Sequence, residues 1–149
     1  MATLGRNENT ASTRSALAPK AQAIADTFYN LYKTQFEGHY IFSGMKGDTE
    51  PIGTSATATA YPGDPLPTTW YQGDSTPPSL ITGPGTTLQY GVAGNEAAFT
   101  EMKAGLEALW YGLSNNSLSD IDSAITSLKK AQTDLSVMQG RVGGQINTL

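Results

Sequence analysis

The sequence predicts an α+β protein, in which an elongated bundle of long helices carries a small inserted antiparallel β domain. Three segments of the 149-residue chain repeat apolar residues at alternating steps of four and three, which is the period of a helix with one apolar stripe. Residues 45–94 contain seven of the eight prolines, and proline is excluded from helix interiors. We therefore expect a helical rod domain from residues 1–44 and 95–149, with 45–94 as an outer β region.

The first helix is expected to begin near Ser15, because serine is a good N-cap and Pro19 then falls in the first turn. Gly38 is expected to end it, because glycine readily adopts the left-handed conformation that follows a helix. The Tyr40–Phe42 stretch follows directly and is expected to cover the end of the bundle, with Tyr40 and Phe42 on one face and His39 outside.

The second helix is expected to begin after Asn95 and to break at residues 115–117, and the third to begin within SLSD. Ser117 and Ser119 both fit a capping pattern there. Three glycines follow Met138, so we expect this tail to fray unless neighbouring helices hold it. The expected heptad seam of the three helices consists of Leu17, Ile24, Phe28, Leu31, Leu106, Leu109, Ile125, Leu128 and Leu135.

Several short β-prone runs lie between the first two helices. Residues 68–72, 79–82 and 87–92 are rich in strand formers and are flanked by turn formers. The GPGT run at 83–86 indicates a hairpin turn between the last two. Residues 55–61 form either another strand or a loop. Because this region has few large apolar residues, we expect it to lean on the helices.

Charge and composition exclude several functions. The net charge is −4, and no basic residue lies between Lys46 and Lys103, so neither nucleic acid nor an anionic membrane surface is an expected partner. The chain has no cysteine, which excludes disulfides and thiolate metal sites. The N-terminus lacks the apolar core of a cleaved signal peptide.

No combination of residues indicates catalysis. His39 is the single histidine; a pair with Asp48 is conceivable, but a surface residue at a helix exit is the simpler interpretation. Ser43 lacks the G-x-S-x-G context of a nucleophile elbow and is interpreted as a turn residue. We therefore expect no enzyme activity, no cofactor and no metal.

The aromatic residues of the β region leave an alternative open. Trp70, Tyr71 and Tyr90 could form a stacking platform for sugars, which would make the chain a carbohydrate-binding surface module. Trp70 and Tyr71 fall on opposite faces of a strand, so a small hydrophobic core is the competing interpretation.

Three motifs resemble the bacterial flagellin family, and most of all its hook-associated protein 3 branch, the hook–filament junction protein. They are GHYIFSGMKGDTEP at 38–51, YQGD at 71–74 followed by the Phe99 helix start, and MQGRVGGQINTL at 138–149. The matching positions are Gly38, Tyr40, Ile41, Phe42, Ser43, Gly44, Lys46, Pro51, Tyr71, Gly73, Asp74, Phe99, Arg141, Gly143, Asn147 and Leu149. Residues 75–78 depart from the family pattern, and its extreme terminal helices are absent, so the chain resembles a core fragment.

The resemblance implies a structural, self-assembling protein of the extracellular bacterial flagellum. It implies export without a cleaved signal peptide, with an export chaperone, hook-associated protein 1 and flagellin as partners. Since the terminal helices serve polymerisation in that family, we expect this fragment alone to be monomeric or weakly associating.

Overall fold

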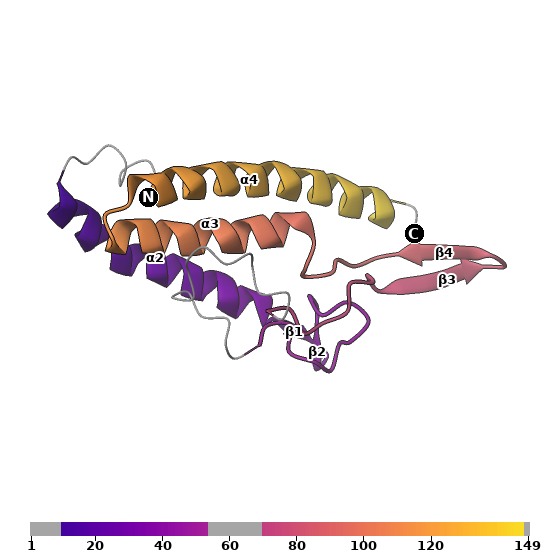
Figure 1. Ribbon diagram of the computed structural model, residues 1–149. Coiled ribbons are helices and arrows are strands. Elements are labelled where there is room, and N and C mark those ends of the chain that lie inside the picture. The colour runs from indigo at the N-terminus through magenta and orange to yellow at the C-terminus, as the bar shows by residue number, and fades with distance from the viewer. Residues whose placement is uncertain (1–9, 54–69, 148–149) are drawn as a thin grey trace.

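The computed structural model describes residues 10–53 and 70–147, so residues 55–61 and Leu149 lie outside the described part. Three helices dominate it: α2 (Ala11–Tyr32), α3 (Ala97–Ser114) and α4 (Leu118–Ile146). The helix α3 lies between the other two and packs against both (Figure 1).

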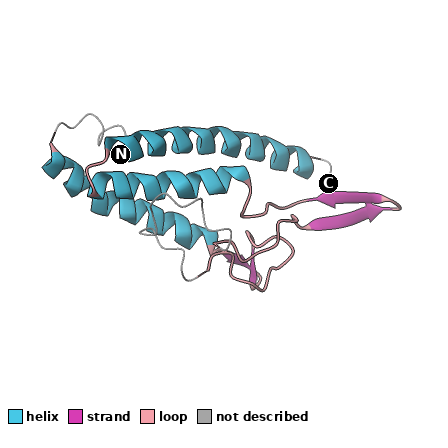
Figure 2. Cartoon of the chain, viewed as in Figure 1, coloured by secondary structure: helices cyan, strands magenta, loops and turns pink. Residues whose placement is uncertain are grey.

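Two antiparallel hairpins complete the described fold (Figure 2). The strands β1 (Gln35–Phe36) and β2 (His39–Tyr40) pair directly after α2. The strands β3 (Ser79–Gly83) and β4 (Thr86–Gln89) pair around the turn at 83–86, as the sequence predicts. This second hairpin projects beyond the helices (Figure 1). Helices and sheets together confirm the α+β class.

The boundaries of α2 differ from the prediction at both ends. The helix begins earlier, because the Thr10 side chain accepts a hydrogen bond from the Thr13 N–H at 3.2 Å and caps it. Pro19 therefore lies inside the helix. The helix ends at Tyr32, before Gly38. Glu37 and Gly38 both have positive φ, 49° and 83°, and form the two-residue turn of the β1–β2 hairpin.

The face of α2 that contacts α3 is also different from the expected seam. Its buried residues are Arg14, Ala18, Ala21, Ala25, Tyr29 and Tyr32. Small residues allow the two helix backbones to approach closely, whereas the larger residues of the predicted seam lie one position along. Ile24 and Leu31 remain 44% and 62% exposed. Leu17 and Phe28 are partly buried at the edge.

Glycines on α3 bring it close to α4. A Cβ added at Gly105 would lie 2.7 Å from Leu128 Cγ, and one at Gly112 would lie 2.8 Å from the Ile121 N. Leu106 and Leu109 are buried at these contacts. At the other end of the helices, Arg14 Nε donates to Asn116 Oδ1 at 2.5 Å and joins α2 to the α3–α4 turn.

The beginning of α4 follows one of the two predicted caps, and its end is longer than predicted. The Ser117 side chain accepts from the Asp120 N–H at 3.4 Å. The helix continues through Gly140 and Gly143 to Ile146. Met138 is buried and Val142 packs against the same cluster, which explains why the glycines do not end the helix.

Candidate functional site at the junction of helices and strands

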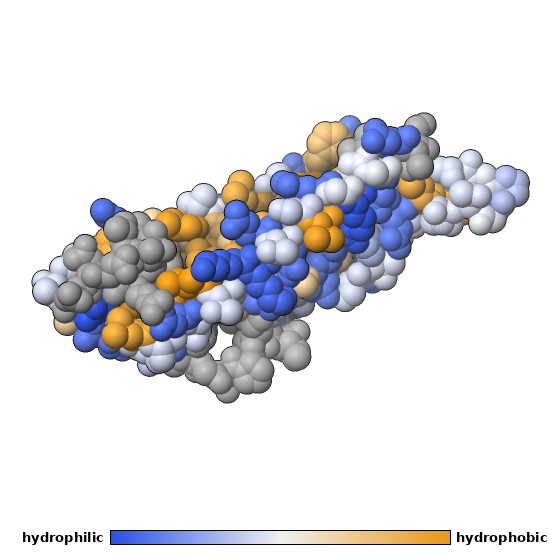
Figure 3. Space-filling view, turned by 90° about the horizontal axis from the view of Figure 1, so that it is seen from above, coloured by the Kyte–Doolittle hydropathy of each residue, from blue (hydrophilic) through white to orange (hydrophobic). Residues whose placement is uncertain are grey.

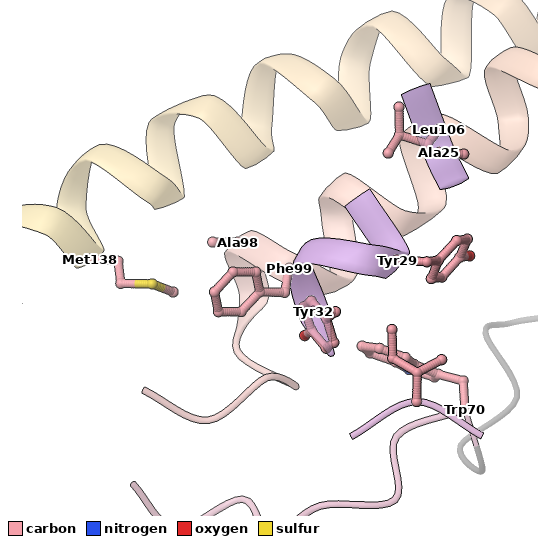
Figure 4. Packing of buried hydrophobic residues seen from close by; sticks show 9 residues of the cluster. Ala25, Tyr29, Tyr32, Trp70, Ala98, Phe99, Leu106 and Met138 are labelled. Atoms are coloured by element: carbon pink, nitrogen blue, oxygen red, sulfur yellow. The ribbon is translucent and has the colours of Figure 1, made fainter. Parts of the chain in front are cut away.

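An aromatic cluster covers the end of α2. The ring of Tyr32 stacks on Phe42 with centroids 5.2 Å apart and planes inclined by 13°. Phe99 meets Tyr32 edge-on at 5.3 Å, and Trp70 lies 6.0 Å away on the other side. Figure 4 shows Tyr32 between the Phe99 and Trp70 rings. The predicted covering role of Phe42 is therefore consistent with its contacts.

The backbone around Ser43 joins two of the sequence motifs. The Ser43 carbonyl accepts the Asp74 N–H at 2.9 Å, while its buried hydroxyl donates to the Thr49 carbonyl at 2.5 Å. The Phe42 carbonyl accepts the Gly94 N–H at 2.8 Å. Segments around residues 43, 74 and 94 are thus held together at one point, which we call the junction.

Glycines let these backbones approach. Gly44 has a φ of +60°, and a Cβ there would lie 2.1 Å from the Asp74 carbonyl oxygen. At Gly73 a Cβ would lie 2.8 Å from the Ser43 carbonyl oxygen, and at Gly94 it would lie 2.7 Å from that of Phe42. No side chain fits at these three positions without movement of the backbone.

The hydroxyl of Tyr71 bonds the junction from inside. It lies 2.9 Å from the Phe42 carbonyl and 3.0 Å from the Asp74 carbonyl, and it accepts the Gly94 N–H at 3.3 Å. Burial raises the pKa of this phenol. The Thr76 N–H donates to Asp74 Oδ1 at 2.7 Å and lowers the pKa of that carboxyl.

The third motif reaches the junction through one side chain. Both carboxylate oxygens of Glu96 accept from Arg141 Nη2, at 2.7 and 2.6 Å. Glu96 is the N-cap of α3, and its Oε1 also accepts the Ala93 N–H at 3.2 Å. The predicted cap, Asn95, donates instead to Ser75 Oγ at 2.7 Å. Arg141 therefore fixes the end of α4 beside the start of α3.

Other predicted motif residues lie apart from these contacts. Ile41 and Lys46 are exposed, while Tyr40 is half-buried and its N–H donates to the Gly47 carbonyl at 2.8 Å. Gly143 and Asn147 lie on the exposed surface of the last turns of α4. The structure brings together Phe42, Ser43, Gly44, Tyr71, Gly73, Asp74 and, near them, Phe99 and Arg141.

A buried charged group was missed by sequence reasoning. Lys103 and Glu107 lie one turn apart on α3, and the ammonium contacts Glu107 Oε1 inside the protein. Tyr29 of α2 donates to the same oxygen at 2.8 Å, and burial, followed by Glu107, raises the pKa of its phenol. The only signal in the sequence is a pair of opposite charges four residues apart on an otherwise apolar helix.

The alternative stacking platform is not formed. Trp70 is buried against Tyr32, Tyr71 is tied to backbone, and Tyr90 is exposed away from them. His39 is exposed and pairs with Asp48 at 2.9 Å. Within residues 10–53 and 70–147, no three potential ligands gather as a metal site would need. No described helix has the length and apolarity to cross a membrane.

An apolar hollow opens beside the aromatic cluster. It encloses about 190 Å³ and is lined by Phe28, Leu31, Tyr32, Phe42, Phe99, Met102 and Leu135, from α2, the junction, α3 and α4. No polar surface lines it. Other apolar side chains are visible between polar ones along the helices in Figure 3, where the hairpin at the far right is largely pale.

These features define an α+β protein in which a helical unit passes into a β region through one interlocked junction. The fold is that of FlgL from Bacillus cereus: its crystal structure matches with a TM-score of 0.74 at 18% sequence identity, over 99% of this chain and 67% of that one. No family model matches the sequence. No curated protein matches it either.

Proposed function

We propose that this chain is part of a structural subunit of the bacterial flagellum, of the hook-associated protein 3 type. The observation that carries the proposal is the agreement of two independent signals. The chain has the fold of FlgL, which is hook-associated protein 3. In addition, the sequence motifs that resemble the family meet at one junction in space.

The junction gives a subunit of this type what it needs mechanically. It turns the chain out of the helices at Tyr32 and returns it at Glu96, with bonds that join both passages. Residues 1–44 and 95–149 would form the rod, and residues 45–94 the outer region. A subunit placed this way outside the cell would need no catalytic group.

The apolar residues left open on α2 support association through helices. Ile24 and Leu31 are exposed, and Leu31 lines the hollow that reaches α4. Contiguous exposed apolar surface is typical of a docking face. We propose that other flagellar axial proteins, hook-associated protein 1 and flagellin, are the partners of the assembled subunit, and that a chaperone covers this face during export.

The test is association with the flagellin and the hook-associated protein 1 of the same organism. We expect the chain alone to sediment as a monomer or weak oligomer at micromolar concentration, and the full subunit to bind both partners. Leu31→Asp in the full subunit should weaken this binding, whereas Ile81→Asp on the projecting hairpin, which is equally open to solvent, is the control. Absence of binding to both partners, or long filaments from the chain alone, would contradict the proposal.

A further inference from the structure

The contact between α2 and α3 has a weakness that its buried charged group can correct. Ala18, Ala21 and Ala25 repeat along the buried face of α2 at the spacing of successive helix turns. A slide of α2 by one turn, about 5.4 Å, would place another small residue where each alanine lies. Packing of such a stripe therefore discriminates poorly between neighbouring registers.

The charged group makes contacts that such a slide would break. Lys103 and Glu107 are each 2% exposed. Glu107 Oε1 accepts from the Tyr29 hydroxyl at 2.8 Å on the α2 side. The Lys103 ammonium lies 5.6 Å from the centre of the Trp70 ring, which comes from the β region. Anion and cation therefore face two different elements, each with a matching group.

Stability alone does not account for this arrangement. Removing two charges from water costs several kcal/mol per ion, and a buried pair often contributes no more than well-packed apolar side chains would. Breaking the pair on one side, however, leaves an uncompensated buried charge and is strongly unfavourable. A buried pair therefore contributes most by making wrong arrangements costly.

We propose that Lys103 and Glu107 form an orientation key, which selects one register of α2 on α3 and one placement of the β region. In the native register Glu107 receives the Tyr29 hydroxyl, and Lys103 lies over the face of Trp70, where a cation is favoured. After a one-turn slide Glu107 loses the hydroxyl. If the β region docks elsewhere, Lys103 loses the ring.

The first experiment exchanges the two charges by Lys103→Glu with Glu107→Lys. The exchanged pair keeps its spacing, and a glutamate that precedes a lysine by four residues is the better order in a helix. A simple ion pair would therefore tolerate the exchange. The key would not, because a carboxylate would face Trp70 and an ammonium would face the Tyr29 hydroxyl hydrogen.

We expect the exchange to raise the unfolding equilibrium constant on the order of 100-fold, as for a broken buried pair, in urea titrations followed by circular dichroism. The matched control is the exposed pair of α4, Lys130→Asp with Asp134→Lys, which has the same spacing and should change the constant far less. Exchanged Lys103 and Glu107 that remain as stable as the wild type overturn the proposal.

The second experiment removes the key without leaving a buried charge: Tyr29→Phe, Lys103→Met and Glu107→Leu together, in a Trp110→Phe background. We expect this variant to keep its helix content but to give more than one indole N–H resonance from Trp70, since several arrangements become populated. A single sharp resonance, as in the Trp110→Phe parent, overturns the proposal even if the exchanged variant fails to fold.

Discussion

The junction and the β3–β4 hairpin are built from similar stretches of sequence, rich in glycine, proline and threonine, yet they lie in opposite environments. At the junction, Trp70 and Ile52 are buried and backbone bonds link residues 42–43 to residues 74 and 94. In the hairpin, Leu80 and Ile81 are 54% and 77% exposed, and the strands pair chiefly with each other.

The difference shows what fixes a polar β region to helices. Aromatic rings bury large areas, and Phe42, Trp70 and Tyr71 reach the end of α2 or the backbone beside it. The hairpin has aliphatic and polar residues but no aromatic contact with a helix. A two-stranded hairpin by itself is marginally stable, so the junction, rather than strand content, is expected to determine the stability of this region.

The largest effect should come from Gly44→Ala. A left-handed residue other than glycine costs about 1–2 kcal/mol, and a Cβ only 2.1 Å from the Asp74 carbonyl oxygen adds about 1–3 kcal/mol of overpacking. We expect a loss of roughly 3 kcal/mol in urea unfolding. Gly85→Ala in the hairpin also has positive φ but meets no atom, so it should cost only the backbone term. Equal losses would show that backbone conformation, and not the close approach, governs Gly44.

Phe42→Ala should follow, with a loss of about 3 kcal/mol, near the lower limit for a phenylalanine in a core because Phe42 is only partly buried. His39→Ala removes an exposed side chain three residues away and should stay within about 0.5 kcal/mol. Ile81→Ala tests the hairpin in the same way and should also be nearly neutral. A loss at His39 as large as that at Phe42 would contradict the covering role of Phe42. These comparisons need only chemical denaturation monitored by circular dichroism.

The smallest of these effects is expected for Tyr71→Phe. The change keeps the ring and removes a hydroxyl that lies within hydrogen-bond distance of two carbonyls and one N–H, so it should cost about 1–3 kcal/mol. Tyr90→Phe removes an exposed hydroxyl from the end of the hairpin and is the matched control. Amide hydrogen exchange would locate the effect: Gly94 should lose protection in Tyr71→Phe. Unchanged protection there would mean that water replaces the hydroxyl without loss.

Local features of this chain could be predicted because they depend on nearby residues. The four-three spacing around Leu106 and Leu109 indicated a helix, Ser117 was one of two predicted caps, and the turn formers at 83–86 indicated the β3–β4 hairpin. The end of α2 was wrong because Gly38 was assigned to the nearest helix. Its left-handed conformation serves the β1–β2 turn instead, and either use of a glycine satisfies the same local rule.

Only the tertiary structure decided which faces are buried and which distant residues meet. Periodicity located an apolar stripe on α2, but the alanine stripe beside it is buried, because small side chains let the backbones of α2 and α3 come close. The burial of Lys103 and Glu107 depends on Tyr29 and Trp70, which lie far away in the chain. The sequence by itself determined the helical periods, the hairpin turn and the presence of the motifs. Their meeting at the junction required the packed chain, because burial and contact depend on what the rest of the molecule places against each surface.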